Sequence, residues 1–157
     1  MSSSVLCKIC LIGAPAVGKT SLVQRVARGV FPPEPATQGI AVTEIALPVS
    51  GAKISLWDIA GRCALDSLNQ AFLSRVDVLL AVASPDVPES ERIAHDLLAQ
   101  AQSLHPRARA ALLVNKIDLG QGALPEARPG LPVFAVSARD GCGIEQVLTA
   151  ALEAGIA

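Results

Sequence analysis

The segment Gly13–Thr20, with the sequence GAPAVGKT, constrains the fold of this chain more than any other feature. It fits the pattern G-x-x-x-x-G-K-[ST], between a short apolar run, Val5–Ile12, and a segment with helical spacing of apolar residues, Gly18–Arg28. A strand, a glycine-rich loop and a helix in this order aim backbone amides and the positive end of the helix dipole at one point, which suits a phosphate. An incidental glycine-rich turn is the alternative. The lysine and hydroxyl that follow Gly18 at the predicted helix start favour the phosphate site.

The residue types in this loop predict separate tasks. The glycines let backbone amides converge on phosphate oxygens, Lys19 reaches the outer phosphates, and the hydroxyl of Thr20 is a ligand for Mg²⁺. The residues expected to bind phosphate share this loop or the start of the helix: Gly13, Ala16, Val17, Gly18, Lys19, Thr20 and Ser21.

The rest of the chain alternates strands and helices. Three apolar runs are typical of strands buried in a parallel sheet: Val76–Ala83, Arg109–Val114 and Leu131–Val136. Three segments carry apolar residues at helical intervals: Gly61–Leu73, Pro88–Leu104 and Ile144–Leu152. Two runs separated by turn residues predict an antiparallel hairpin: Ile40–Leu47 and Lys53–Asp58. Together they predict an α/β domain of three layers, with helices on both faces of a six-stranded, mostly parallel sheet containing one antiparallel strand.

Length and composition limit the possible functions. A chain of 157 residues, 51% hydrophobic and 17% charged, fits one folded domain over 1–157 and excludes disorder as its main state. A net charge of −1 with no basic patch argues against a nucleic-acid partner. The apolar runs are too short to span a bilayer, and neither a signal sequence nor a lipidation motif is evident. We therefore expect a cytoplasmic protein without a membrane anchor of its own.

The cysteines do not predict a metal site. Cys7 and Cys10 have the spacing of half a metal site, but they lie in the first apolar run. The two-residue period of a strand puts them on opposite faces, so we interpret them as core residues.

The tetrad Asn115-Lys116-Ile117-Asp118 indicates which base is bound. It follows a predicted strand at the carboxyl edge of the sheet, where folds of this type bind ligands. The Asp118 carboxylate can accept hydrogen bonds from N1 and the exocyclic amine of guanine, whereas adenine offers no such pair of donors. Alone, the tetrad could be a polar loop. After a phosphate loop and a strand it favours guanine over the alternative of an ATP-dependent kinase, for which no arginine-rich lid is evident.

With these motifs in place, the sequence resembles the small Ras-like GTPases of the Ras and Rab type over nearly its whole length. Thr37-Gln38-Gly39 is similar to the first switch of that family, and Trp57-Asp58-Ile59-Ala60-Gly61 to the start of the second. Ser137-Ala138-Arg139 is similar to its guanine loop. The resemblance implies a P-loop GTPase fold and a switch that binds GTP or GDP with Mg²⁺.

The resemblance also implies residue roles. Thr20 and Thr37 would bind Mg²⁺ and Asp58 a water on the metal, while Gly61 would donate its amide to the γ-phosphate. Phe31 and Lys116 would cover the two faces of guanine, and Asn115 would brace the loops. The Ala138 amide would meet the carbonyl oxygen of the base, within the guanine loop of Ser137, Ala138 and Arg139.

One departure concerns the chemistry. Arg62 replaces the glutamine that orients the attacking water in the family, and a guanidinium has donors but no acceptor. We therefore predict slow GTP hydrolysis, with Arg62, Gly61, Lys19 and Thr37 as the candidate catalytic residues. Two alternatives remain for Arg62: a finger that stabilises charge in cis, or a solvated side chain. Pro15 and Ala16, where the family usually has glycine, would crowd an activating partner's inserted finger.

The predicted function is a GTP/GDP molecular switch with slow hydrolysis, read by protein effectors and regulators through Gly39–Leu47 and the 61–73 helix. The alternative is a GTP-bound interaction module in which Arg62 makes hydrolysis negligible.

Overall fold

The computed structural model describes residues 5–28, 40–46, 53–59, 76–120, 125 and 129–156. The helix predicted at 61–73 lies outside these residues. That the chain forms one domain over 1–157 stays a prediction.

The described residues form one mixed sheet. Its strands are β1 (Val5–Gly13), β2 (Ile40–Ala46), β3 (Lys53–Ile59), β4 (Val78–Ala83), β5 (Arg109–Val114) and β6 (Val133–Ala135). They lie in the order β2-β3-β1-β4-β5-β6, where β2 is antiparallel to β3 and the other pairs are parallel. This confirms the predicted six-stranded sheet with one antiparallel strand, although β6 is shorter than the apolar run that predicted it.

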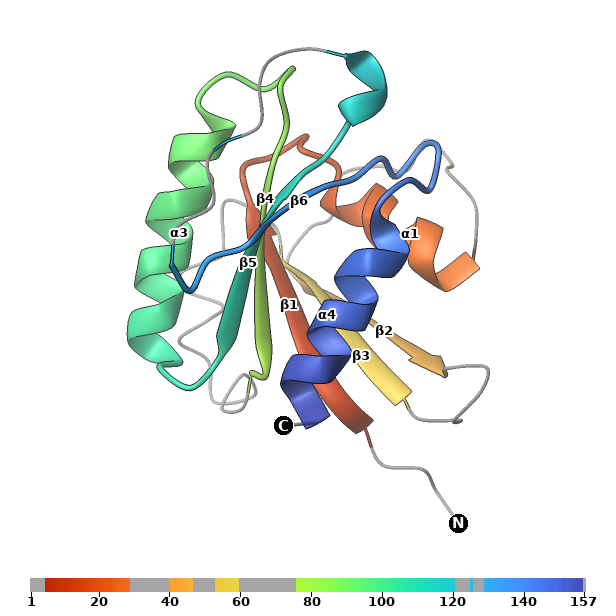
Figure 1. Ribbon diagram of the computed structural model, residues 1–157, viewed down its shortest axis with the longest axis vertical. Helices are drawn as coiled ribbons and strands as arrows, with labels where there is room; N and C mark the ends of the chain where they lie inside the picture. The colour runs from red at the N-terminus through yellow and green to blue at the C-terminus, as the bar shows by residue number, and fades with distance from the viewer. Residues whose placement is uncertain are drawn as a thin grey trace.

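Helices cover both faces of the sheet (Figure 1). Helix α3 (Ser90–Leu104) lies on one face, and α1 (Lys19–Arg28) and α4 (Ile144–Ile156) lie on the other. The predicted three layers are therefore confirmed. Helix α3 begins two residues later than predicted, because Glu89 has a left-handed backbone with φ of 62°. None of the helices in the described part of the chain is both long and apolar enough to cross a bilayer.

The central strand β1 supplies both halves of the core. Cys7, Ile9 and Leu11 pack toward α1 and α4, whereas Cys10 and Ile12 pack toward α3. Burial raises the pKa of Cys7 to about 11 and that of Cys10 to about 12, so both thiols stay protonated at neutral pH. The two cysteines are core residues on opposite faces, as predicted, and the described residues contain no cluster of three metal-binding side chains.

The topology collects several loops at one edge. The parallel strands β1, β3, β4, β5 and β6 all end there, and the segments that follow β1, β4, β5 and β6 leave the sheet side by side (Figure 1). In an open α/β sheet this carboxyl edge is where ligands bind.

Candidate functional site

The loop between β1 and α1 encloses the ammonium of Lys19. Its Nζ donates to the carbonyl oxygens of Gly13 at 3.1 Å and Ala14 at 2.9 Å, and the residue is only 7% exposed. Burial lowers the pKa of Lys19, and the negative charge of Asp58 opposes that effect. The loop therefore holds a buried positive charge beside the N-terminus of α1, the combination that stabilises a phosphate.

The backbone conformation and the neighbours of position 18 require a glycine there. Its backbone has φ of +98°, and a Cβ atom there would lie 2.2 Å from Nδ2 of Asn115. A side chain would thus be strained and would displace Asn115. Ala16, at φ of 69°, gives the same loop a second left-handed position.

Thr20 and Asp58 come together at the start of α1. The Thr20 hydroxyl donates to Oδ2 of Asp58 at 2.5 Å, and Asp58 is 1% exposed at the carboxyl end of β3. Mg²⁺ prefers oxygen ligands, and a hydroxyl beside a carboxylate suits it. These two residues therefore fit the metal that the sequence predicted.

Asn115 joins three segments. Its Nδ2 donates to the carbonyl oxygen of Val17 at 2.9 Å, and its Oδ1 accepts the backbone amide of Ala138 at 3.1 Å. The side chain is 1% exposed, so each bond replaces one that water would otherwise make. Asn115 thereby fixes the phosphate loop and the segment after β6 to the end of β5, the bracing role that the sequence predicted.

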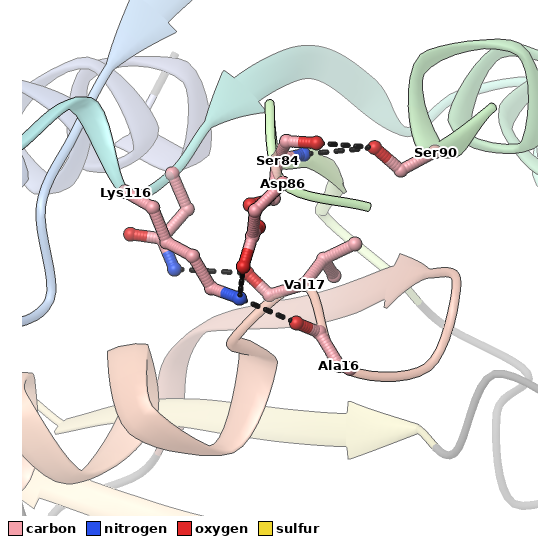
Figure 2. A network of polar contacts seen from close by, with 7 residues as sticks. Ala16, Val17, Ser84, Asp86, Ser90 and Lys116 are labelled. Carbon is pink, nitrogen blue, oxygen red and sulfur yellow. Dashed lines mark hydrogen bonds and ion pairs between the residues drawn. The ribbon is translucent and has the colours of Figure 1, made fainter. Parts of the chain in front are cut away.

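Lys116 crosses from β5 to the phosphate loop (Figure 2). Its Nζ lies 2.7 Å from the carbonyl oxygen of Ala16 and 2.9 Å from Oδ2 of Asp86. Sequence reasoning missed Asp86. An acidic residue three positions after the end of the buried strand β4, at the same edge as the other motifs, was the available indication.

Asp118 and the segment after β6 form the far end of the site. The buried Ser137 hydroxyl donates to Oδ1 of Asp118 at 2.9 Å and accepts the amide of Asp140 at 3.0 Å. Asp118 and Arg139 are exposed, whereas Ala138 is buried. A hydroxyl thus orients an accessible carboxylate, as a base-reading acceptor requires.

Other predicted site residues have less structural support. Ser21 is half-buried in α1. Phe31, Thr37, Gly61 and Arg62 lie outside the described residues, so their roles stay predictions.

A phosphate loop after β1, an acid ending β3 and polar loops after β5 and β6 define a P-loop GTPase domain. The model of the family Roc, described as "Ras of Complex, Roc, domain of DAPkinase", matches residues 8–118. The chain belongs to this family of Ras-like small GTPases.

Individual relatives agree with this family. The chain is 34% identical to human "Ras-related protein Rab-30" over 74% of its own length and 59% of that protein. It is 34% identical to "tRNA modification GTPase MnmE" of Parasynechococcus marenigrum over 93% of its length and 33% of that protein. It is 30% identical to "GTP-binding protein rho3" of Schizosaccharomyces pombe over 71% of its length and 56% of that protein. The chain therefore spans little more than half of Rab-30 or rho3, and a third of MnmE.

Proposed function

We propose that this protein is a guanine-nucleotide switch that binds GTP and GDP with Mg²⁺ and hydrolyses GTP. The observation that carries the proposal is the hydrogen bond from Asn115 to Val17, which ties the tetrad ending in Asp118 to the phosphate loop. One ligand with a guanine base and a phosphate chain spans these two segments. The similarity to MnmE, a tRNA modification GTPase, and to rho3, a GTP-binding protein, supports the same activity.

The phosphate end takes its charge from the loop after β1. Phosphate oxygens bind the ammonium of Lys19 and the backbone amides of four loop residues: Gly13, Ala16, Val17 and Gly18. Ser21 follows in the first turn of α1. Thr20 and Thr37 would hold Mg²⁺, and Asp58 would hold a water on it. When bound, the metal neutralises charge on the phosphate oxygens.

The guanine end is recognised by hydrogen bonds. Asp118 accepts from N1 and the exocyclic amine, and the Ala138 amide donates to the carbonyl oxygen of the base. Lys116 and Phe31 cover its faces, while Ser137 and Arg139 complete the loop.

The γ-phosphate end controls turnover. Gly61 donates its amide to that phosphate, and Arg62 in place of glutamine makes hydrolysis slow. A GTP-bound module with negligible hydrolysis is the second candidate, favoured by the lack of an acceptor on Arg62.

The output of the switch is protein binding in the cytoplasm. Edge strand β2 supports this, because Val42 on it is 49% exposed and can contact an effector. Segments 39–47 and 61–73 form the surface that effectors and regulators read.

Nucleotide competition tests the base assignment. The protein is loaded with a fluorescent GDP analogue and Mg²⁺, and GTP, GDP or ATP is added in increasing amounts. GTP and GDP should displace the analogue, while ATP should need a concentration about 10⁴-fold higher. Displacement by ATP at concentrations comparable to GTP would contradict the proposal.

Single-turnover hydrolysis separates the two candidates. Wild type and the Arg62→Gln variant are loaded with GTP and Mg²⁺, and conversion to GDP is followed. Slow hydrolysis in wild type supports the switch, and a further fall in the variant would make Arg62 a group that stabilises charge in cis. An inert wild type with turnover restored by glutamine would instead establish the GTP-bound module.

A further inference from the structure

The loop between β4 and α3 is locked by two buried serines (Figure 2). The Ser90 hydroxyl donates to the carbonyl oxygen of Ser84 at 2.8 Å and accepts the Ser84 amide at 2.9 Å. Ser84 and Ser90 are 4% and 2% exposed. The Ser84 hydroxyl in turn donates to Oδ1 of Asp86. One carboxylate oxygen of Asp86, Oδ1, is therefore oriented by the hydroxyl of a buried serine.

The second oxygen of Asp86 faces Lys116. Oδ2 lies 2.9 Å from Nζ of Lys116, and the same Nζ donates to Ala16 at 2.7 Å. Burial by itself raises the pKa of Asp86, but hydrogen bonds from Ser84 and Lys116 outweigh it and hold the pKa below the ordinary 3.8. Asp86 is thus ionised at neutral pH and pairs with the lysine that contacts the phosphate loop.

This pair is less exposed than the other ion pairs near the start of α3, with 28% of the Lys116 side chain and 39% of the Asp86 side chain exposed. Arg92 pairs with Glu89 and Asp96, but all three side chains are at least 58% exposed. An exposed pair of that kind contributes little, because both flexible side chains must be ordered in water. At Asp86 the carboxylate is already oriented by Ser84, so less freedom is lost when Lys116 binds it.

We propose that Asp86 is a positioning residue that holds Lys116 against the carbonyl oxygen of Ala16 and thereby slows the release of guanine nucleotide. This inference rests on the proposed function. A lysine has a flexible stem and three donors, and without a fixed acceptor its ammonium turns toward water. Asp86 holds Lys116 in one orientation, so that the hydrogen bond from Lys116 to Ala16 of the phosphate loop is kept.

The test is the dissociation rate of a fluorescent GDP analogue from the full chain with Mg²⁺. Asp86→Ala should release it about two- to fivefold faster than wild type. Ser84→Ala should change the rate in the same direction but less, because it frees the carboxylate without removing it. The control Asp96→Ala removes an ion-paired carboxylate on α3 and should leave the rate unchanged. Equal rates for wild type and Asp86→Ala would overturn the inference.

A second background separates positioning from a general loss of stability. In Lys116→Met, the further change Asp86→Ala should have no effect, since the lysine it acts through is gone. The same acceleration in both backgrounds would overturn the inference.

If Lys116→Met does not retain nucleotide, the salt dependence of the dissociation rate tests the inference instead. The ratio of the Asp86→Ala rate to the wild-type rate should fall toward one in about 1 M KCl, where the Debye length is about 3 Å. An unchanged ratio would overturn the inference. Failure of wild type to bind GDP would instead contradict the proposed function.

Discussion

The side-chain amide of Asn115 donates to the carbonyl oxygen of Val17 at 2.9 Å across 98 positions of sequence. The side-chain oxygen of Asn115 accepts a hydrogen bond from the backbone amide of Ala138. A single buried side chain thus sets the distance between the phosphate loop and the loops that follow β5 and β6. Any change that moves Asn115 disturbs all three.

Gly18→Ala should cause such a displacement. Its Cβ would lie 2.2 Å from Nδ2 of Asn115, so both hydrogen bonds of that side chain would be lost. Gly120→Ala is the matched control, because Gly120 also has a left-handed backbone, at φ of +65°, but nothing within 4 Å of its Cβ. We expect a loss of about 1–2 kcal/mol in the control from backbone strain alone. Gly18→Ala should lose about 2 kcal/mol more, measured by urea unfolding. Equal losses would show that Asn115 moves without cost.

Thr20→Ala should weaken the dependence of nucleotide binding on Mg²⁺. The hydroxyl that meets Asp58 is absent from the variant. Losing a direct oxygen ligand should lower metal affinity by at least about 10-fold, because even losing an outer-shell partner costs about 10- to 100-fold. GDP release in Mg²⁺ should speed up, and adding EDTA should speed it little further. Thr20→Ser keeps the hydroxyl and should behave as wild type. A large EDTA effect in Thr20→Ala would contradict the metal assignment.

Asp118→Asn should change the base that is bound. An amide can donate to the extra carbonyl of xanthine but cannot accept both guanine donors, so preference should shift from guanine to xanthine nucleotides by up to about 10⁴-fold. Displacement of a fluorescent analogue by GDP and XDP measures this. The control Asp140→Asn changes a different exposed carboxylate, which lies beyond β6, and should leave the base preference unaltered. Normal GDP binding by Asp118→Asn would remove Asp118 from base recognition.

The buried Lys19 predicts a pH effect on the nucleotide-free protein. Burial lowers its pKa below the ordinary 10.5, so over that interval the unfolded chain binds more protons than the folded one. The free energy of unfolding should therefore rise as the pH increases from the folded-state pKa toward 10.5. Urea unfolding of wild type and Lys19→Met at several pH values isolates this contribution, since other groups titrate in both. A constant difference between them would contradict it.

Much of the fold was predictable because the elements carry strong local patterns. Strand β5 has the predicted limits, Arg109–Val114, since an unbroken apolar run lies between polar residues. Strand β6 is harder, because the run at 131–136 includes Pro132, which has no amide, and only Val133–Ala135 pair as a strand. Helix α4 extends beyond the predicted end to Ile156.

The site was predictable where one short motif supplies its chemistry. Lys19, Thr20 and Asn115 follow from such motifs, and the structure places them at one edge of the sheet, while their roles toward a nucleotide stay predictions. Asp86 was not predictable in this way, because the role proposed for it depends on its contact with Lys116, 30 residues away in the sequence. The two residues meet because β4 and β5 are neighbours in the sheet. Contacts of that kind depend on topology.

The long-range hydrogen bond from Asn115 to Val17 has a consequence for folding during synthesis on the ribosome. The phosphate loop is synthesised before Asn115, which follows Val17 by 98 positions and bonds to it, and before Ala138, which bonds to Asn115; synthesis proceeds at about 5–20 residues per second. During that interval the phosphate loop has been synthesised but lacks the hydrogen bond from Asn115 to Val17. A guanine nucleotide that contacts both loops is therefore expected to stabilise the chain only after Asn115 and Ala138 have been synthesised.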